Sequence, residues 1–257
     1  MSEMPAANSI HFVGAGPGDP ELITVKGWRL LREADLVIYA GSLVPRALVA
    51  DLAAEVHDSA PLHLDEIISL MATAWQAGKK VVRLHTGDPA IYGAIKEQMR
   101  ELDKQTIPYR VVPGVSSATA TAAALQVELT LPEVSQTVII TRRAGRTPVP
   151  AGQDLASLAA HQATMLILLS VGMIDQVVED LRQGGYPADT PVAVVEKVSW
   201  PEERIVTGTL ADIAATVKGA GITKTAIIAV GKVFGQGDLE AVSRLYDKDF
   251  AHGYRQT

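Results

Sequence analysis

One carboxylate and two hydroxyls stand in small-residue turns that could bind a polar ligand. Asp88 follows the apolar segment Val81–Leu84, and Ser116 and Ser117 follow Tyr109–Val112. We expect both segments to be strands, and in an open α/β sheet ligands collect beyond the carboxyl ends of the strands. A carboxylate beside tight backbone can bind an amine, a ribose or a sulfonium. The turns therefore favour a neutral or cationic ligand over a phosphate.

A second interpretation of Asp88 is equally compatible with the residues alone. The carboxylate could cap a helix that begins near Pro89, which is a common use of Asp. Nucleophilic catalysis has less support, because the sequence lacks a Gly-x-Ser-x-Gly elbow and no base is paired with Ser116 or Ser117. A Walker A motif is also absent, which disfavours phosphate transfer from ATP.

Three arginines form a second candidate cluster. Arg142, Arg143 and Arg146 lie in a Gly/Pro-rich stretch that follows a predicted strand. Guanidinium groups bind carboxylates through two parallel hydrogen bonds, so the cluster suits a polycarboxylate substrate. The alternative is a solvated loop without a ligand.

The loop Gly14–Asp19 (GAGPGD) follows the first predicted strand and superficially resembles a dinucleotide site. Its glycines are spaced G-x-G-x-G instead of G-x-G-x-x-G, and Pro17 and Pro20 lengthen it. The following helix therefore does not begin at the glycines, where it would offer its N-terminus to a pyrophosphate. The second strand also ends in Ala40, where a ribose-binding acid is expected. We predict that this loop does not bind a nicotinamide or flavin nucleotide.

Composition narrows the class of protein. The 257 residues have 47% hydrophobic content, enough for a sizeable core, and a net charge of −6, which disfavours nucleic acid as a partner. There are no cysteines, which excludes disulfides and thiolate chemistry and suits the cytoplasm. We expect no signal peptide and no membrane span, since the apolar run Ala163–Ile174 is shorter than the roughly 20 residues a span needs.

The six histidines give no metal-binding pattern. No His-x-x-x-His pair occurs and no Cys accompanies them, so we predict no protein-bound metal. His85 ends a predicted strand, and we interpret it as a histidine of the core or of a sheet edge whose hydrogen bonds are satisfied.

Strands and helices alternate in the first half of the chain, which predicts an α/β fold with a mostly parallel sheet. The predicted strands are Ser9–Val13, Asp35–Ala40, Val81–Leu84, Tyr109–Val112, Thr137–Thr141, Thr164–Leu169, Pro191–Glu196, Glu203–Thr207 and Thr225–Val230. The predicted helices are Thr24–Glu33, Arg46–Glu55, Leu64–Ala77, Asp154–His161, Met173–Gln183, Leu210–Val217 and, in part, Leu239–Tyr246. The rhythm breaks at 125–136, so we expect domains at 1–125 and 126–257, the second with a mixed sheet.

Four segments together resemble the tetrapyrrole (corrin/porphyrin) methyltransferases. They are Val13–Gly27, His85–Gly93 (HTGDPAIYG), Val112–Thr119 (VPGVSSAT) and Pro191–Leu210. The resemblance covers the chain from residue 9 to about 235. It implies two α/β domains with S-adenosylmethionine in a cleft between them, a homodimer, and methyl transfer to ring carbons of uroporphyrinogen or precorrins.

The resemblance also implies site residues. The residues expected to bind the methyl donor are Pro17, Gly87, Asp88, Ile91, Ser116 and Ser117 from the first domain, with Val171, Val198 and Ala226 from the second. The residues expected to bind the tetrapyrrole are Gly14, Gly16, Tyr39 and Ser42, joined by Arg142 and Arg143 from the arginine cluster.

One departure from the family pattern concerns catalysis. Uroporphyrinogen methylases typically have an Asp after the second strand's Tyr, whereas Tyr39 here begins the run YAGSLV. This run resembles one precorrin-methylating branch of the family. The change removes the residue usually proposed as a base in relatives, so no catalytic acid or base is assigned. Another precorrin, uroporphyrinogen III, and a carrier without turnover remain alternatives.

Overall fold

The computed structural model describes residues 9–41, 43–235 and 253, which form two compact units. Of the described residues, unit 1 contains 9–120 and Ser199–Pro201, and unit 2 contains 121–198 and those from 202 to 235. The division expected after residue 125 lies just past a helix, whereas the units separate inside that helix. Separate binding roles for two domains stay a prediction. The predicted segment Leu239–Tyr246 lies outside the described residues.

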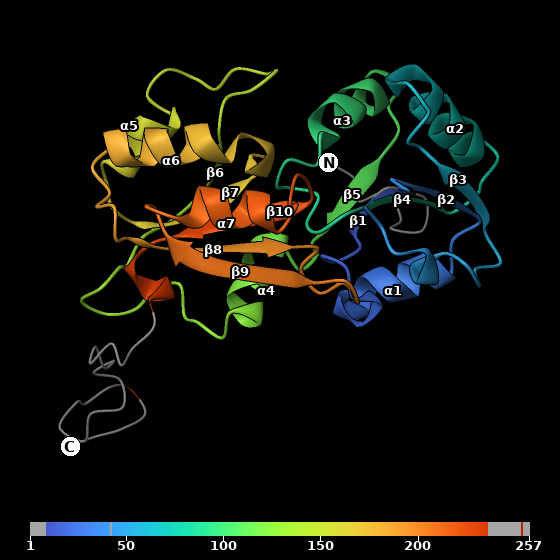
Figure 1. The fold of residues 1–257 in the computed structure, drawn as a ribbon. Coiled ribbons are helices and arrows are strands. Elements are labelled where there is room, and N and C mark those ends of the chain that lie inside the picture. The colour runs from blue at the N-terminus through green and yellow to red at the C-terminus, as the bar shows by residue number, and fades with distance from the viewer. Residues whose placement is uncertain (1–8, 42, 236–252, 254–257) are drawn as a thin grey trace. The chain divides into compact units, whose positions relative to one another are not determined.

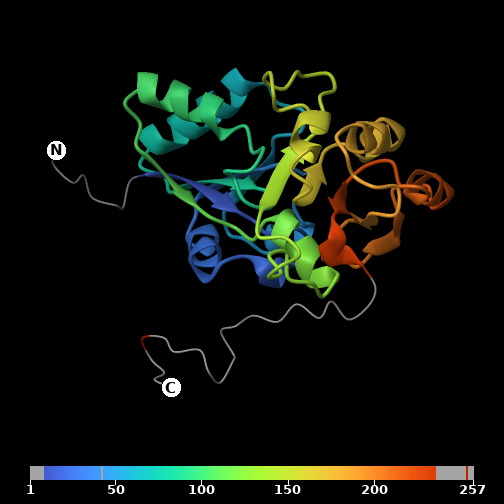
Figure 2. The same ribbon diagram turned by 90° about the vertical axis from the view of Figure 1, so that its left-hand side faces the viewer.

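Unit 1 is built on a parallel sheet with strand order β3-β2-β4-β1-β5. The strands are β1 (Ile10–Gly14), β2 (Leu36–Tyr39), β3 (Glu55–Asp58), β4 (Val81–His85) and β5 (Tyr109–Val112). The helices are α1 (Val25–Arg32), α2 (Leu64–Gln76) and α3 (Ile95–Lys104). The helices α2 and α3 cover one face of the sheet and α1 covers the other (Figures 1 and 2). Covered on both faces, β2 and β4 are buried along their whole length.

The helix α2 shows how local sequence signals position an element. Ile67, Ile68 and Met71 form its buried face against the sheet. The Glu66 carboxylate accepts a hydrogen bond from the His63 backbone N–H at 2.8 Å, which closes the first turn. Gly78 follows the helix with a φ of 76°, a left-handed conformation that glycine adopts without strain. The expected helix and its glycine stop are confirmed.

The predicted helix Arg46–Glu55 is wrong. Arg46–Leu48 form one 3₁₀ turn, and the chain then enters β3, which pairs with β2 at the edge of the sheet. The sequence of β3 is EVHD, and its side chains are mostly exposed. A polar edge strand lacks the apolar alternation on which strand prediction depends. The strand β3 could therefore not be predicted from the sequence.

Unit 2 contains a mixed sheet with strand order β6-β7-β10-β8-β9, as expected. The strands are β6 (Val138–Arg142), β7 (Thr164–Leu168), β8 (Pro191–Glu196), β9 (Arg204–Thr209) and β10 (Ala226–Val230). The helices are α5 (Leu155–Ala159), α6 (Ile174–Gln183) and α7 (Ile213–Gly219), and α4 (Ser117–Ala124) crosses from unit 1 into unit 2. Apolar residues of α5, α6 and α7 form one core with the inward side chains of β7, β8 and β10.

Strand directions bring distant segments to one edge of the unit 2 sheet. Arg142 at the end of β6 pairs with Leu168 at the end of β7, which runs parallel to it. Ala226 at the start of β10 pairs with Glu196 at the end of β8. Because β10 is antiparallel to β7 and β8, its first residue lies beside the last residues of those strands. The predicted residues of unit 2 lie at or just after the ends of β6, β7 and β8, or at the start of β10.

Candidate functional site

Three loops of unit 1 meet where β1, β4 and β5 end. These strands are neighbours and parallel, so their carboxyl ends lie at the same edge. The first two loops are joined directly, because the Gly87 N–H donates to the Gly16 carbonyl at 2.7 Å and the Gly16 N–H donates back at 3.4 Å. The predicted residues of unit 1 on these three loops are Gly14, Gly16, Pro17, Gly87, Asp88, Ile91, Ser116 and Ser117.

Glycines allow the three loops to approach backbone to backbone. A Cβ placed on Gly114 would lie 2.2 Å from the carbonyl oxygen of Gly87 and 2.8 Å from Cα of Gly14. A Cβ placed on Gly14 would lie 2.6 Å from Cα of Gly114. No side chain fits at these distances, so this close approach of the loops requires glycine at both positions. The candidate site is therefore lined here by main chain.

Asp88 joins the second and third loops. Its Oδ1 accepts a hydrogen bond from the Ala90 N–H at 2.7 Å, and its Oδ2 accepts one from the Gly114 N–H at 3.0 Å. The alternative in which Asp88 caps the next helix is wrong, because α3 begins at Ile95 and the preceding residue is Ala94. Both carboxylate oxygens thus contribute to the geometry of the loops.

The serines and Ile91 are accessible at the same loops. Ser116 stands before α4, and its hydroxyl accepts a hydrogen bond from the Ala118 N–H at 3.2 Å. Ser116, Ser117 and Ile91 are partly exposed, whereas Gly87 and Pro17 are buried. Partly exposed hydroxyls beside bare backbone are suitable groups for a polar ligand.

Tyr39 ends β2, one strand beyond these loops, and is 8% exposed. Ser42 lies outside the described residues. A carboxylate that sequence reasoning missed lies next to this segment: Asp58 at the end of β3 accepts hydrogen bonds from the Ala60 N–H at 2.8 Å and the Gly41 N–H at 2.9 Å. These two bonds hold the pKa of Asp58 below its usual value, so it is a weak base. The signal was hidden because β3 itself was not predicted.

His85 ends β4 and is not the satisfied histidine that we predicted. It is 6% exposed, its ring centroid lies 5.9 Å from that of Phe12, and its Nε2 has no hydrogen-bond partner in the described part of the chain. Burial, with a contribution from buried Arg83, lowers the pKa of His85 to about 3. The imidazole is therefore neutral near pH 7. Arg83 is itself bonded to Gln98 and to the Ile38 carbonyl, each at 3.1 Å.

The apolar candidate residues of unit 2 are mostly core residues. Val171 lies in the 3₁₀ turn after β7, Val198 follows β8, and Ala226 starts β10. Their exposed fractions are 4%, 6% and 7%. Val171 and Ala226 pack in the same core as α6. Any contact of these residues with a ligand would involve mainly their backbone.

Arg142 and Arg143 bind groups of their own unit. Arg142 donates to the carbonyls of Thr147 at 3.1 Å and Pro148 at 2.8 Å. The Arg143 Nε donates to Asp180 on α6 at 2.6 Å. Arg146, the third member of the cluster, is exposed, and its side chain has no hydrogen bond or ion pair among the described residues.

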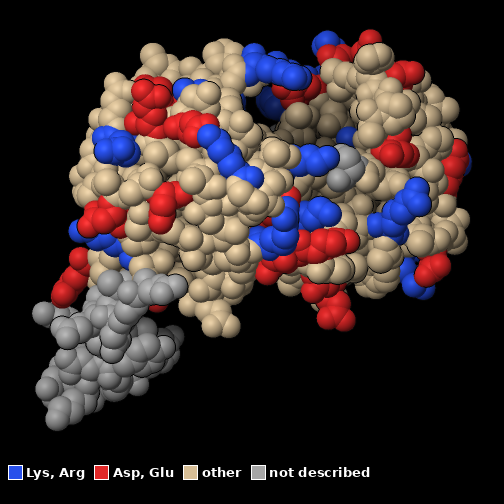
Figure 3. All heavy atoms as spheres, in the orientation of Figure 1, with Lys and Arg blue, Asp and Glu red and all other residues tan. Residues whose placement is uncertain are grey.

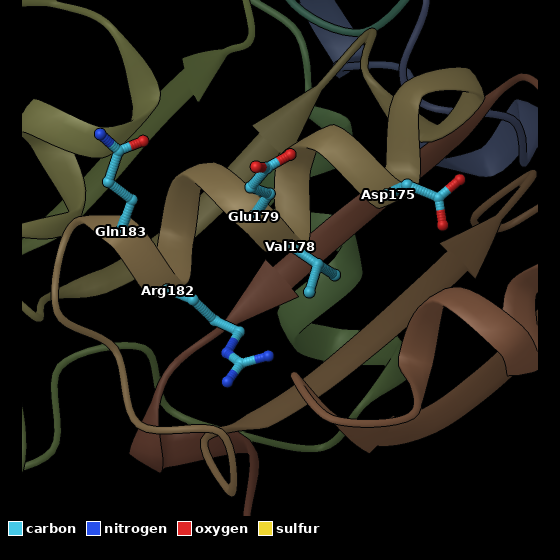
Figure 4. A pocket seen from close by; sticks show the side chains of 5 residues that line it. All are labelled: Asp175, Val178, Glu179, Arg182 and Gln183. Atoms are coloured by element: carbon cyan, nitrogen blue, oxygen red, sulfur yellow. The ribbon is translucent and has the colours of Figure 1, made fainter.

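Other features of the described residues do not form a competing site. Among the residues that the structure describes, no group of three or more His, Asp or Glu is placed to bind a metal, and no helix is long and apolar enough to cross a membrane. A shallow hollow of about 700 Å³ runs along α6 (Figure 4). Its lining is Asp175, Val178, Glu179, Arg182 and Gln183, which includes none of the predicted residues. Basic and acidic side chains are interspersed on the face seen in Figure 3.

Comparison with known proteins identifies the family. Residues 9–214 match the profile of the Tetrapyrrole (Corrin/Porphyrin) Methylases. The chain belongs to this family, and the resemblance read from its motifs is confirmed.

Similar proteins include enzymes that act on precorrin-4. The chain is 59% identical to cobalt-precorrin-4 C(11)-methyltransferase of Methanocaldococcus jannaschii over 96% of both chains. It is 49% identical to precorrin-4 C(11)-methyltransferase of Pseudomonas aeruginosa over 96% of this chain and 98% of that one. A solved cobalt precorrin-4 methyltransferase superposes with a TM-score of 0.87 at 45% identity, covering 91% of this chain and 100% of the other. The two-sheet α/β fold is thereby confirmed.

A more distant solved structure contains a ligand. Uroporphyrin-III C-methyltransferase of Thermus thermophilus, complexed with S-adenosylhomocysteine, superposes with a TM-score of 0.74 at 30% identity, covering 88% of this chain and 92% of that one. The use of S-adenosylmethionine is consistent with this relative and with the family.

Proposed function

We propose that this protein transfers a methyl group from S-adenosylmethionine to carbon 11 of precorrin-4, with or without cobalt in the macrocycle, giving precorrin-5 in cobalamin biosynthesis. The observation that carries the proposal is similarity over nearly the whole chain. Identity is 59% with a cobalt-precorrin-4 C(11)-methyltransferase and 49% with a precorrin-4 C(11)-methyltransferase, but 34% with a uroporphyrinogen III methyltransferase of Methanosarcina barkeri.

The geometry of unit 1 fits such chemistry. The methyl group of a sulfonium is already activated, and an electron-rich macrocycle supplies the nucleophilic carbon. The protein must then align carbon, methyl and sulfur and exclude water, which requires rigid positioning more than a catalytic side chain. Backbone-lined loops fixed by Asp88 and by close glycine contacts provide that rigidity.

We assign the donor to residues of both units. From unit 1 we propose the loops that carry Gly87, Asp88 and Ser116, and from unit 2 the segments at Val171 and Ala226, with the other residues predicted above. Asp88 acts mainly by shaping the loops, because both of its oxygens already accept backbone hydrogen bonds. No general base is proposed.

For the tetrapyrrole we propose the loop that begins at Gly14 and the arginine cluster. The macrocycle carries several carboxylates, and guanidinium groups are suited to bind them. Arg146 is the member whose side chain is exposed, whereas Arg142 and Arg143 chiefly shape the loop. We further propose that the protein is a cytoplasmic homodimer. Light scattering of the purified chain would test whether it is a dimer.

The decisive experiment is a methylation assay with the purified chain, S-adenosylmethionine and precorrin-4, with and without cobalt. A product that carries one added methyl group, located at carbon 11 by NMR with a ¹³C-labelled donor, supports the proposal. Methylation of uroporphyrinogen III or of another precorrin alone would identify a different acceptor. Tight binding of S-adenosylhomocysteine without turnover of any tetrapyrrole would identify a carrier.

A further inference from the structure

The connection between β8 and β9 contributes to unit 1. Ser199–Pro201 belong to unit 1, although the strands on either side of them belong to unit 2. The Trp200 indole Nε1 donates to the carbonyl of Pro17 at 2.9 Å, although the two residues are 183 positions apart. The Ser199 hydroxyl accepts a hydrogen bond from the Asp19 N–H at 3.0 Å. The connection therefore binds the glycine loop that follows β1 (Figure 1).

The indole ring also fits against Gly18. A Cβ on Gly18 would lie 2.2 Å from Cδ1 and 2.5 Å from Nε1 of Trp200. The ring thus occupies the volume that any side chain at position 18 would need. Gly18 is buried in this contact.

The turn that presents Trp200 has an unusual backbone. Lys197 has a φ of 49° and Ser199 a φ of 64°, and residues other than glycine rarely adopt this left-handed conformation. Such conformations persist where the surroundings enforce them. The surroundings of this turn include the hydrogen bonds of Ser199 with Asp19 and of Trp200 with Pro17, and the bond from the Lys197 N–H to the Thr225 carbonyl at 2.8 Å.

The three loops of the candidate site are stabilised in different ways. Asp88 joins the second and third loops, which carry most of the proposed donor residues. Trp200 and Ser199 instead fix the first loop, which carries Gly14 and Gly16. We assigned Gly14 and Gly16 to the tetrapyrrole. The contacts of Asp88 thus act on the two loops that carry most of the donor residues. Those of Trp200 and Ser199 act on the loop that carries Gly14 and Gly16 and only one proposed donor residue, Pro17.

We infer that Trp200 is a positioning residue for the tetrapyrrole. Its hydrogen bond to Pro17 and its packing on Gly18 fix the backbone from Gly14 to Asp19, and this backbone sets the place of the macrocycle. The inference rests on the proposed function, because it takes the acceptor to be a tetrapyrrole bound at this loop.

The first test is Trp200→Phe, which retains an aromatic ring and removes the Nε1–H donor. We expect the KM for precorrin-4 to rise about tenfold, while the dissociation constant of S-adenosylhomocysteine changes less than about twofold. The matched control is Trp28→Phe in α1, where the indole lies at the surface beside Arg32. An unchanged KM, or a KM and a dissociation constant that rise together as the melting temperature drops, would overturn the inference.

The second test uses the contact with Gly18. Gly18→Ala should raise the same KM, because its Cβ collides with the indole. If the two residues act through one contact, adding Gly18→Ala to Trp200→Ala should raise KM less than Gly18→Ala raises it in the wild-type chain. Full additivity of the two effects would contradict the inference. Gly18→Ala and Trp200→Phe remain informative even if Trp200→Ala fails to fold.

The wild-type assay distinguishes a failure of the proposed function from a failure of the role inferred for Trp200. If the wild-type chain methylates no tetrapyrrole, the proposed function fails and the inference about the acceptor fails with it. If the wild-type chain is active and Trp200→Phe has the same KM, only the role of Trp200 is overturned.

Discussion

In both units the candidate residues lie at the ends of strands, but the contacts that hold these segments in place differ between the units. In unit 1 the loops lie beyond the ends of β1, β4 and β5, and in unit 2 the segments lie beside the ends of β6, β7 and β8. The loops of unit 1 meet through glycine backbone and one carboxylate. The edge of unit 2 depends on long side chains, chiefly Arg142 with two carbonyls and Arg143 with Asp180.

This difference has a consequence for mutation. A backbone junction cannot accept an added methyl group without moving, since main-chain atoms cannot rotate away. A side-chain network can rearrange, and its loss is felt chiefly by its own partners. Unit 1 should therefore be the region where small substitutions have large effects.

Gly114→Ala should have the largest effect. Its Cβ would lie 2.2 Å from the Gly87 carbonyl oxygen, so the loops must separate. We expect the free energy of unfolding to fall by about 3 kcal/mol and S-adenosylhomocysteine binding to weaken more than about tenfold. Urea unfolding and calorimetric titration measure the two effects. A variant as stable as the wild-type chain would show that the junction is not tight.

Asp88→Ala and Asp180→Ala compare one carboxylate from each unit. Asp88→Ala leaves the N–H groups of Ala90 and Gly114 without their acceptor, and we expect the dissociation constant of S-adenosylhomocysteine to rise about tenfold. Asp180→Ala removes the partner of Arg143, and we expect a loss of roughly 1 kcal/mol in stability with donor binding unchanged. Equal effects of the two variants on donor binding would remove the distinction between the units.

Much of unit 1 could be predicted because its signals are local. The apolar strands β4 and β5 and the small-residue turns after them can be read within a few residues of the chain. Their parallel packing follows from the alternation with helices. The strand β3 was missed because it is polar and lies at the edge of the sheet, and Asp58 was missed with it.

The contacts that fix the loops could not be predicted, because they join distant parts of the chain. Trp200 and Pro17 are 183 positions apart, and Arg143 and Asp180 are 37 apart. No periodicity or turn chemistry specifies such pairs, which depend on the path of every element between them. The sequence placed Asp88 in the candidate site, but its hydrogen bond to Gly114 appears only in the fold.

The stability of unit 1 should depend on pH through His85, and this effect should be smaller than those of the substitutions above. Burial lowers its pKa in the folded protein to about 3, whereas an unfolded histidine titrates near 6.5. Between these values only the unfolded chain binds the proton, so stability falls as the pH falls, by about 1 kcal/mol from pH 6.5 to pH 5.5.

A comparison of variants isolates this contribution. The pKa of His11 is also lowered by burial and acts in the same direction, so the wild-type profile alone is insufficient. His85→Gln should lose about 1 kcal/mol less than the wild-type chain over this pH range, and exposed His161→Gln in unit 2 serves as the control. Parallel stability profiles for His85→Gln and the wild-type chain would refute the assignment.

Gly219→Ala in unit 2 should have the smallest effect and the opposite sign to Gly114→Ala. Gly219 is the last residue of α7, and an added Cβ would meet no atom within 4 Å. Alanine restricts the unfolded chain more than glycine does, so we expect the free energy of unfolding to rise by up to about 0.5 kcal/mol.

Gly221, two residues later, has a φ of 68°, and Gly221→Ala should instead lower the free energy of unfolding by about 1 kcal/mol. Urea unfolding of the two variants tests whether a glycine matters through its backbone angle, as at Gly221, or through a close neighbour, as at Gly114. A loss of stability in Gly219→Ala would contradict this prediction.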